Sequence, residues 1–532
     1  MLGGSNLIFG PTTLLFEPFC GFLTPPGAVS QALAPERRMS HTSDAMDEGA
    51  AAGVHWVSES SQGESVKLTL TLEPQLLRGT PISVALSGFC KHWRGLSSFE
   101  RDLYSLSQPV ESIDVFLSHD WETSRFMKTL TLLLCFNSGP AAVAALLCAI
   151  GLAALKTWEV IGAEWTFTTY LVFFIFLLFW QRMKCRLFPT MVFLDKLCIH
   201  QEDDKLKQKG ILGLGAFVRA SDKLLVLWSK RTFRRLWCAH EIGCFLSRTR
   251  RGQIEILPVT QVAILYLSSI MWHLLIPCYR WTLSEVREID PDSGLLSVAL
   301  ISSVVAPVAS VLLPLVNYLG MTMMDEIDEL PQQLRGFEIQ SCQCFCCSHE
   351  HQHPVTGKKL ICDRELVYKS LAELYPQAVE PLSVFNSEVR EALRPRILRR
   401  LRVEVPLKYL ASLVWVSSLP LLSELISTLA KGRQEPAAWW LIRLLEFLQP
   451  CSAMLFALSF CNCLWSFRKL FKHKICLSIL LAPIQGTCVG AVWAGFELTK
   501  ALTEENSLWP LLPFTLALAL NVLLLLCGPG SI

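Results

Sequence analysis

The chain has 532 residues, of which 52% are hydrophobic and 18% are charged. Because soluble domains carry about 25% charged residues, a large part of this chain is expected to lie in a lipid bilayer. The net charge of +2 gives no reason to expect a nucleic-acid partner. The 20 cysteines are scattered over apolar segments and one tight cluster, which is not the pattern of a secreted disulfide framework.

The N-terminal part of the chain precedes the first apolar span. Residues 1–64 lack a basic leader and are interrupted by Pro and Gly, so we interpret them as a flexible segment without a cleaved signal peptide. Residues 65–110 contain "VKLTLTL", whose alternation of apolar and polar residues predicts a half-buried strand. We therefore expect a small strand-containing cytosolic segment here.

Eight segments are apolar enough to cross a bilayer as helices, for which about 20 residues are needed. They are approximately Leu130–Leu155, Trp165–Trp180, Val259–Pro277, Leu295–Leu319, Tyr409–Ile426, Pro450–Trp465, Cys476–Phe496 and Leu508–Cys527. The second segment is short. The sixth is preceded by Arg443 and Glu446, which are three residues apart and are expected to pair on one helix face.

The segments that connect these spans alternate in charge. "KTWEVIGAE", "YRWTLSEVREIDPD" and "ELTKALTEENS" are net negative, whereas "QRMKCR", "RPRILRRLR" and "RKLFKHK" are basic. Since Lys and Arg stay on the cytosolic side of a membrane, both chain termini are assigned to the cytosol. The weakly basic "AKGRQEP" is the exception to the alternation.

An α/β pattern lies on both sides of the first two spans. "IDVFLS" predicts a buried strand, and after the spans "MVFLD", "DKLLVLWS" and "IEILPVT" predict three more, separated by segments of helical spacing. Such alternation argues for a parallel sheet, with a site at the carboxyl ends of its strands. Two crossings return the chain to the side that it left, so the two parts of the domain are able to reassemble.

The predicted order of segments follows from these patterns. It is the flexible segment 1–64, the strand-containing segment 65–110, the first part of the α/β domain 111–129, a transmembrane hairpin 130–181, the second part of the domain 182–258, a second hairpin 259–319, a cytosolic Cys/His-rich loop 320–408 and about four spans in 409–527.

The strand and helix motifs resemble those of Toll/interleukin-1 receptor (TIR) domains. The matching stretches are "DVFLSHDW", "VFLDKLCIHQ", "SDKLLVLWS" and "RRLWCAHEI". "LDKLCIHQEDD" also resembles a signature of the related heterokaryon-incompatibility domains. The resemblance implies a flavodoxin-like parallel sheet in the cytosol, attached to a multi-pass α-helical membrane protein of about eight spans. A span follows "IEILPV", where the fifth strand and last helix of the family belong.

Some TIR domains hydrolyse NAD⁺, and the resemblance places their catalytic glutamate at Glu241. A carboxylate near the ribose stabilises the oxocarbenium-like charge that forms as nicotinamide leaves. Trp237 lies four residues before Glu241, on the same helix face, and is expected to wall the pocket, while His119, Asp195 and His200 are candidate substrate-binding residues. In the alternative interpretation, Glu241 is a solvated glutamate favoured by the helix dipole.

The stretch "CQCFCCSHEHQHP" is the second chemical signal. Cys344 and Cys347 have a common zinc-pair spacing, and Cys342 and Cys362 are the candidates to complete four ligands. A second interpretation is that these cysteines are acylated next to the membrane. A third is that they neither bind zinc nor carry an acyl group.

Two functions follow from the sequence. The first is membrane-anchored signalling by self-association of the TIR-like domain, through scaffolding or NAD⁺ hydrolysis. The alternative is a transporter or channel regulated by that domain. Pro307 and Pro314 favour the alternative, because helix breakers are typical of transporter spans. Transport sites also usually place ionisable residues within the spans, and these spans hold almost none apart from His273, which argues against transport.

Overall fold

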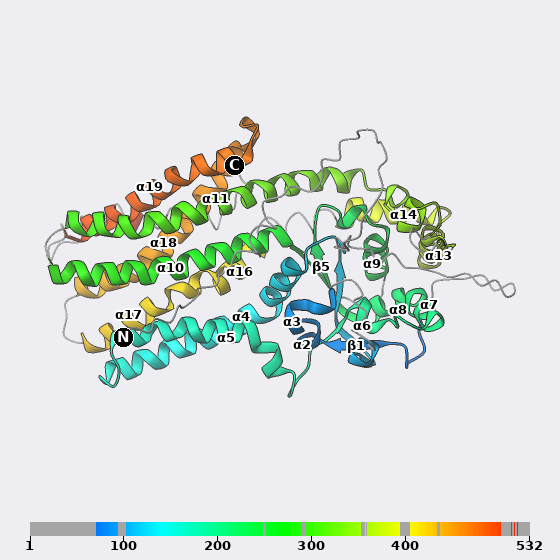
Figure 1. Ribbon diagram of the computed structural model, residues 1–532, viewed down its shortest axis with the longest axis horizontal. Coiled ribbons are helices and arrows are strands. Elements are labelled where there is room, and N and C mark those ends of the chain that lie inside the picture. Colours follow the sequence, from blue (N-terminus) through cyan, green and yellow to red (C-terminus); the bar gives the residue numbers. More distant parts are fainter. Residues whose placement is uncertain are drawn as a thin grey trace, which may run out of the picture. The chain divides into compact units, whose positions relative to one another are not determined.

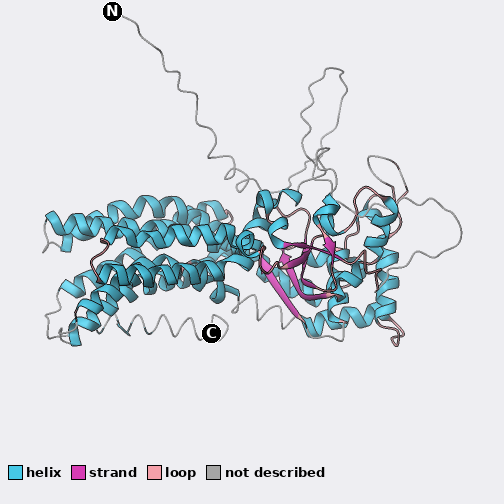
Figure 2. Ribbon diagram, turned by 90° about the horizontal axis from the view of Figure 1, so that it is seen from below, coloured by secondary structure: helices cyan, strands magenta, loops and turns pink. Residues whose placement is uncertain are grey.

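The computed structural model describes residues 71–93, 103–247, 252–289, 294–352, 357, 359–393, 405–432, 437–501, 512, 515, 516 and 519. Figure 1 shows long helices side by side, and Figure 2 shows the strands gathered into one sheet. The flexible segment 1–64, most of "VKLTLTL" and nearly all of the eighth predicted span lie outside the described residues.

Four parallel strands form the centre of the sheet. They are β3 (Ile113–His119), β4 (Met191–Phe193), β5 (Ser221–Trp228) and β6 (Gln253–Pro258), in the spatial order β4-β3-β5-β6. All four coincide with strands predicted from the sequence. β3 and β4 are hydrogen-bonded neighbours although the chain between them holds two long helices.

The sheet is mixed rather than purely parallel. β1 (Arg78–Pro81) pairs antiparallel with the edge of β4, and β2 (Gln108–Pro109) pairs antiparallel with β1. The Arg78 Nε donates to Ser107 Oγ at 2.9 Å, and its guanidinium stacks 4.2 Å above the ring of Tyr104. The small segment before the first span therefore completes the sheet instead of forming a unit of its own.

Six helices in the described part of the chain are long and apolar enough to cross a membrane. They are α4 (Arg125–Thr157), α5 (Thr168–Lys184) with the turn before it, α10 (Val259–Ile289), α11 (Gly294–Arg335), α18 (Ala437–Ser466) and α19 (Lys474–Ala501). They correspond to the first four, the sixth and the seventh predicted spans. Large apolar side chains such as Leu147, Leu171 and Ile479 are exposed on them, as lipid-facing residues would be.

The fifth predicted span is a broken helix. α16 (Val405–Leu413) and α17 (Leu419–Lys431) are joined by a 3₁₀ turn, so neither piece reaches the length of a span by itself. Tyr409 lies near the sheet, where its hydroxyl bonds Glu255 at 2.9 Å, and Lys431 pairs with Glu159 at the far end of α4. The two pieces together therefore run the length of α4.

Neighbouring helices satisfy the backbone groups that this break frees. Ser269 Oγ of α10 donates to the carbonyl of Leu413 at 2.7 Å, and Tyr170 Oη of α5 donates to the carbonyl of Ser417. Irregular backbone at membrane depth is tolerated only where protein groups satisfy it in this way. Pro307 and Pro314, by contrast, lie inside the continuous helix α11.

The predicted Cys/His-rich loop is largely helical. α11 runs on to Arg335, and the chain then forms α12 (Phe345–Ser348), α13 (Asp363–Leu374) and α14 (Pro381–Glu388). α13 packs against α9 (Leu236–Leu246), where His240 Nε2 lies 2.9 Å from Ser370 Oγ. These helices cover α9, the helix that carries Glu241.

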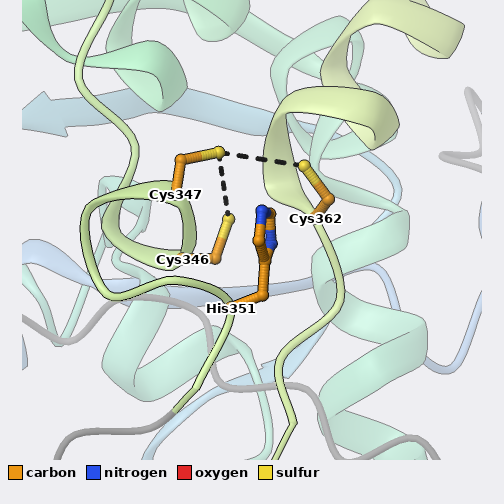
Figure 3. A group of neighbouring side chains, drawn as sticks. All are labelled: Cys346, Cys347, His351 and Cys362. Atoms are coloured by element: carbon orange, nitrogen blue, oxygen red, sulfur yellow. Dashed lines mark hydrogen bonds between the residues drawn. The ribbon is translucent and has the colours of Figure 1, made fainter.

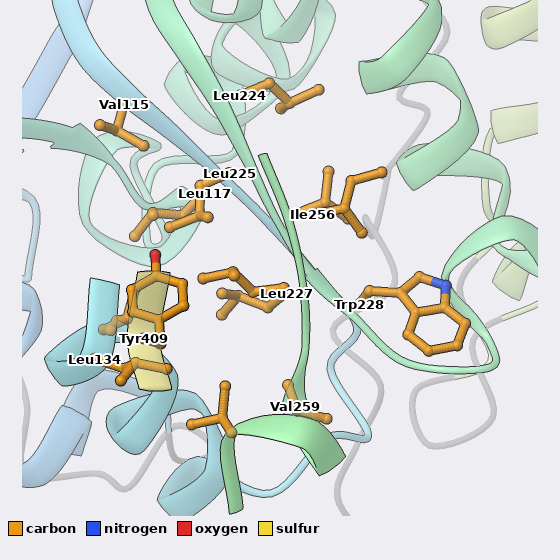
Figure 4. Close-up of a cluster of buried hydrophobic side chains, with 14 of the residues drawn as sticks. Val115, Leu117, Leu134, Leu224, Leu225, Leu227, Trp228, Ile256, Val259 and Tyr409 are labelled. Carbon is orange, nitrogen blue, oxygen red and sulfur yellow. The ribbon is translucent and has the colours of Figure 1, made fainter. Parts of the chain in front are cut away.

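The sheet and the long helices share one apolar core. Figure 4 shows Leu117, Leu225 and Leu227 of the sheet beside Leu134 of α4 and Tyr409 of α16. All five side chains are buried. α10 begins at Val259, directly after β6, so no linker separates the sheet from this helix.

We expect Gly243→Ala to destabilise the protein by about 1–3 kcal/mol, because overpacking a core costs this much. A Cβ at Gly243 of α9 would lie 2.9 Å from Cε2 of Phe385, a fully buried side chain of α14. Gly139→Ala is the matched control, since nothing lies within 4 Å of its Cβ position. Thermal unfolding of both variants measures the effect, and equal unfolding temperatures would contradict the close α9–α14 packing.

Candidate functional site

A cavity of about 90 Å³ lies where β3 and β4 end and α9 begins. Four of the five sequence-predicted site residues of the α/β domain line it, namely His119, Asp195, Trp237 and Glu241. The parallel sheet explains this convergence, because β3 and β4 deliver their last residues to the same edge. Distant parts of the sequence thus meet in one place.

His200 lies outside the cavity. Its Nδ1 accepts hydrogen bonds from the backbone N–H groups of Glu202 at 3.2 Å and Asp203 at 2.8 Å. Its ring packs against Tyr104 at 4.9 Å. These contacts give His200 a role in shaping the loop after β4, where Asp203 caps the helix α7 (Asp204–Leu212).

Glu241 is the most unusual group in the cavity. Within the described structure its Oε2 is enclosed without a hydrogen-bond partner. Burial raises the pKa of its carboxyl group from 4.5 to about 8, and the nearby Asp195 adds to this shift, whereas interaction with the Ser118 hydroxyl and the charge of Arg235 oppose it. A carboxyl group in an apolar setting resists ionisation, so Glu241 is largely protonated at neutral pH.

Asp195 follows β4 and starts the short helix α6 (Asp195–Cys198). Its Oδ1 accepts the backbone N–H of Lys196 at 2.8 Å. Burial raises the pKa of its carboxyl group to about 6. The cavity thus holds two carboxyl groups with different proton affinities.

His119 ends β3 and lies between two indole rings. Its ring centroid is 4.3 Å from that of Trp93 and 4.8 Å from that of Trp121. Burial, together with the positive charge of Lys128, lowers its pKa well below the ordinary value, so the imidazole is neutral. Its Nε2 is enclosed and finds no hydrogen-bond partner among the described residues.

A buried ion pair beside the cavity was not predicted from the sequence. Arg235 Nη1 lies 3.3 Å from Asp120 Oδ1, and Asp120 also accepts from Ser229 Oγ at 3.3 Å. Asp120 is almost fully buried. Arg235 immediately precedes α9 and lines the cavity. A cation directly before the helix that carries Glu241 was the feature of the sequence that could have indicated this ion pair.

The Cys/His-rich segment forms another wall of the cavity. Gln343, Cys344 and Phe345 line it. The carbonyl of Gln343 accepts the N–H of Leu236 at 3.1 Å, and its own N–H donates to the carbonyl of Arg234. The Gln343 carbonyl therefore satisfies one of the N–H groups at the start of α9 that have no partner within the helix. No sequence spacing predicts this contact.

The cysteine cluster assembles differently from the spacing rule. Cys346, Cys347, His351 and Cys362 converge, with one ligand atom from each lying within 4.8 Å of the others (Figure 3). Cys344 Sγ lies 3.0 Å from Cys346 Sγ and 3.8 Å from Asp363 Oδ2. The predicted ligand Cys342 instead directs its thiol at the carbonyl of Phe233, at 3.6 Å.

No family model matches the chain, and no curated protein or solved structure matches it either.

We expect the stability of the Glu241→Gln variant to depend on pH differently from that of the wild type. Between pH 4.5 and about 8 the folded wild type keeps a proton that the unfolded chain has released, because burial raises the pKa of Glu241. Its free energy of unfolding thus falls by up to roughly 1.4 kcal/mol per pH unit in this window. Glutamine has no such proton.

The unfolding temperature of Glu241→Gln should therefore equal that of the wild type near pH 5 and exceed it increasingly towards pH 8. Glu202→Gln, at an exposed position, is the matched control and should follow the wild type. Parallel curves for Glu241→Gln and the wild type would mean that Glu241 is ionised in the folded protein.

Proposed function

We propose that the sheet forms a TIR-like domain that cleaves NAD⁺ and signals by self-association, within a multi-pass membrane protein. The observation that carries the proposal is the enclosed, unpartnered carboxyl oxygen of Glu241 on the wall of a cavity that Trp237 and His119 also line. Buried titratable groups with shifted pKa values in a cleft are typical of catalytic sites.

The strand order supports a flavodoxin-like fold. In chain order the four parallel strands are arranged second, first, third and fourth, which is the start of the flavodoxin-like order. Ligands of such sheets bind at the point where the order reverses, outside the carboxyl ends of the first and third strands. His119 ends the first of these strands and lines the cavity, whereas Trp228, which ends the third, does not line it. The cavity therefore lies beside the switch point, at the ends of the first and second strands.

The proposed chemistry needs one carboxylate and an enclosed site. The bond between the ribose carbon and the nicotinamide nitrogen breaks, and its electron pair leaves with nicotinamide, which becomes neutral. Water then adds its oxygen to the ribose carbon and releases a proton. Ionised Glu241 would stabilise the positive ribose, with a larger effect in a cavity that excludes water.

The size of the cavity limits how the substrate enters. About 90 Å³ is room for roughly six to nine water molecules, each needing about 10–15 Å³. That suffices for a single aromatic ring such as nicotinamide, with Trp237 available to stack on it. The adenosine half would lie outside the cavity, where a second copy of the domain would complete the site.

Transport is the second candidate, and the broken helix α16–α17 favours it. Transporters build substrate sites at discontinuous helices. Here His273 lies beside the break, with its ring 4.6 Å from that of Tyr170 and its Nδ1 3.3 Å from Ser269 Oγ. Another pair of polar groups inside the helix bundle, Asn317 and Gln485, exchanges hydrogen bonds of 2.7 and 2.8 Å. Such pairs serve helix packing.

We expect the purified protein, under conditions that allow self-association, to release nicotinamide from NAD⁺, and Glu241→Gln to lower the rate by roughly 10²–10³, as loss of an electrostatic stabiliser does. The wild-type rate should rise from pH 6 through pH 8 and level off only above it, because half of Glu241 is still protonated at its pKa of about 8. Glu202→Gln should retain the wild-type rate and profile.

No nicotinamide release from a folded, self-associated wild type would leave scaffolding as the role of the domain. Release that Glu241→Gln matches would assign catalysis to another group of the cavity. Substrate flux through proteoliposomes that a variant of the break, Tyr170→Phe, reduces would instead favour transport.

A further inference from the structure

We propose that Cys346, Cys347, His351 and Cys362 bind one zinc ion, and that this centre holds the cavity wall beside Glu241 in place. The fold gathers two groups of potential ligands that share Cys346, and these four residues are the group that offers a full four-ligand set, whereas the other is Cys344, Cys346 and Asp363. Cys347 and Cys362 also belong to the set suggested by sequence spacing. Three thiolates and one imidazole are a ligand set typical of structural zinc, a borderline-soft divalent cation.

The distances between the sulfur atoms fit a tetrahedral metal. With Zn–S bonds of about 2.3 Å, two ligands of one tetrahedron lie about 3.8 Å apart. Cys347 Sγ is 3.9 Å from Cys346 Sγ and 3.9 Å from Cys362 Sγ (Figure 3). Cys344 Sγ, at 3.0 Å from Cys346 Sγ, is too close to be another corner of the same tetrahedron.

Local backbone structure positions each ligand. α12 carries Cys346 and Cys347, and the N–H of His351 donates to the carbonyl of Cys346 at 2.8 Å. Glu350 and His351 both have positive φ angles, of 52° and 59°. Non-glycine residues adopt this conformation at a cost of order 1–3 kcal/mol each, and they persist where surrounding contacts enforce it.

The return of the chain brings in the fourth ligand. The N–H of Leu360 donates to the carbonyl of His351 at 2.7 Å, and Gln352 forms an antiparallel bridge with Lys359. Cys362 follows as the residue that precedes α13. Histidine and the last cysteine are thus held on adjacent backbone segments, as in small zinc modules.

Groups around the cluster suit a bound thiolate centre. The N–H of Asp363 donates to Cys346 Sγ at 3.2 Å, and the Arg364 guanidinium interacts with Cys347. Three thiolates around a divalent ion leave one negative charge, which the guanidinium offsets. Partners of this kind orient the ligands of metal sites and tune their affinity.

The site is connected to the cavity by a short stretch of chain. Gln343, which bonds the N-terminus of α9, precedes the ligand Cys346 by three residues, and Cys344 and Phe345 between them line the cavity. A metal that fixes Cys346 and Cys347 therefore fixes the part of the cavity wall that Gln343, Cys344 and Phe345 form beside Glu241. Zinc would act here as a structural element of the site without taking part in its chemistry.

Metal analysis of the detergent-purified full-length protein tests the ligand set. We expect about one zinc ion per wild-type chain, and less than about one tenth of that in Cys347→Ser, His351→Ala and Cys362→Ser. Cys342→Ser and His349→Ala are the matched controls from the same segment. Cys342 faces the carbonyl of Phe233, and His349 Nδ1 bonds the carbonyl of Phe345, so both variants should keep their zinc.

Cobalt(II) titration of the metal-free wild type provides a measurement that needs no variant to fold. A thiolate-to-cobalt charge-transfer band with tetrahedral ligand-field bands is the expected result. Absence of both zinc and cobalt binding overturns the proposal, as does equal zinc in the ligand variants and the controls. Hydroxylamine-sensitive acyl groups on Cys347 or Cys362 of the metal-free wild type would overturn it in favour of acylation.

Hydrogen exchange tests the link to the cavity. Chelation of the wild type should speed amide exchange at the start of α9 by at least about tenfold, because Leu236 loses a fixed acceptor in Gln343. Cys342→Ser should respond to chelation as the wild type does, and metal-free Cys347→Ser should exchange fast from the outset. Unchanged exchange of α9 on chelation would show that the metal does not organise the cavity.

Discussion

The backbone pairing of β3 with β4 constrains everything else in this protein. Val115 lies opposite Val192 and Phe116 opposite Phe193, although α4 and α5 separate the two strands in the chain. Hydrogen-bonded strands must lie on the same side of a membrane. If α4 and α5 cross it, they must do so as a pair, and a single crossing would leave half of the sheet without its partner.

The same constraint couples the sheet to the helices mechanically. β3 is followed by α4 after five residues, and β6 continues into α10 without a break. Leu134 and Tyr409 pack into the core of the sheet, so the ends of these helices are part of the domain (Figure 4). A change at the carboxyl ends of the strands would therefore be passed directly to the helix ends. This is the physical basis for expecting signalling or regulated transport.

Sequence patterns correctly predicted those parts of the structure that depend on residues close together in the chain. The four parallel strands were predicted because apolar runs such as "DKLLVLWS" end in polar residues. The convergence of His119, Asp195, Trp237 and Glu241 followed from the geometry of a parallel sheet together with the TIR resemblance. The i,i+3 pair of Arg443 and Glu446 was also correct, at 2.6 Å.

Features that depend on distant contacts were not predictable. β1 joins the sheet through pairing with β4, and the apolar residues that follow it form the short helix α2 (Ile82–Ala85). The zinc-pair spacing selected Cys344 and Cys347, whereas the turn of α12 and the positive φ of His351 gather a different set. The break after Leu413 depends on hydroxyl donors from two other helices, which no single segment encodes.

The sidedness of the α4–α5 turn is the most direct test of the split domain. Glu159 lies in this turn with its side chain 80% exposed, and Glu202 lies in the loop after β4. In sealed membrane vesicles that hold the protein, an impermeant maleimide on the non-cytosolic side should label Glu159→Cys above the wild-type background, and Glu202→Cys should be labelled only from the cytosolic side. Labelling of both variants from the same side of the membrane would contradict the insertion of a membrane hairpin into the sheet.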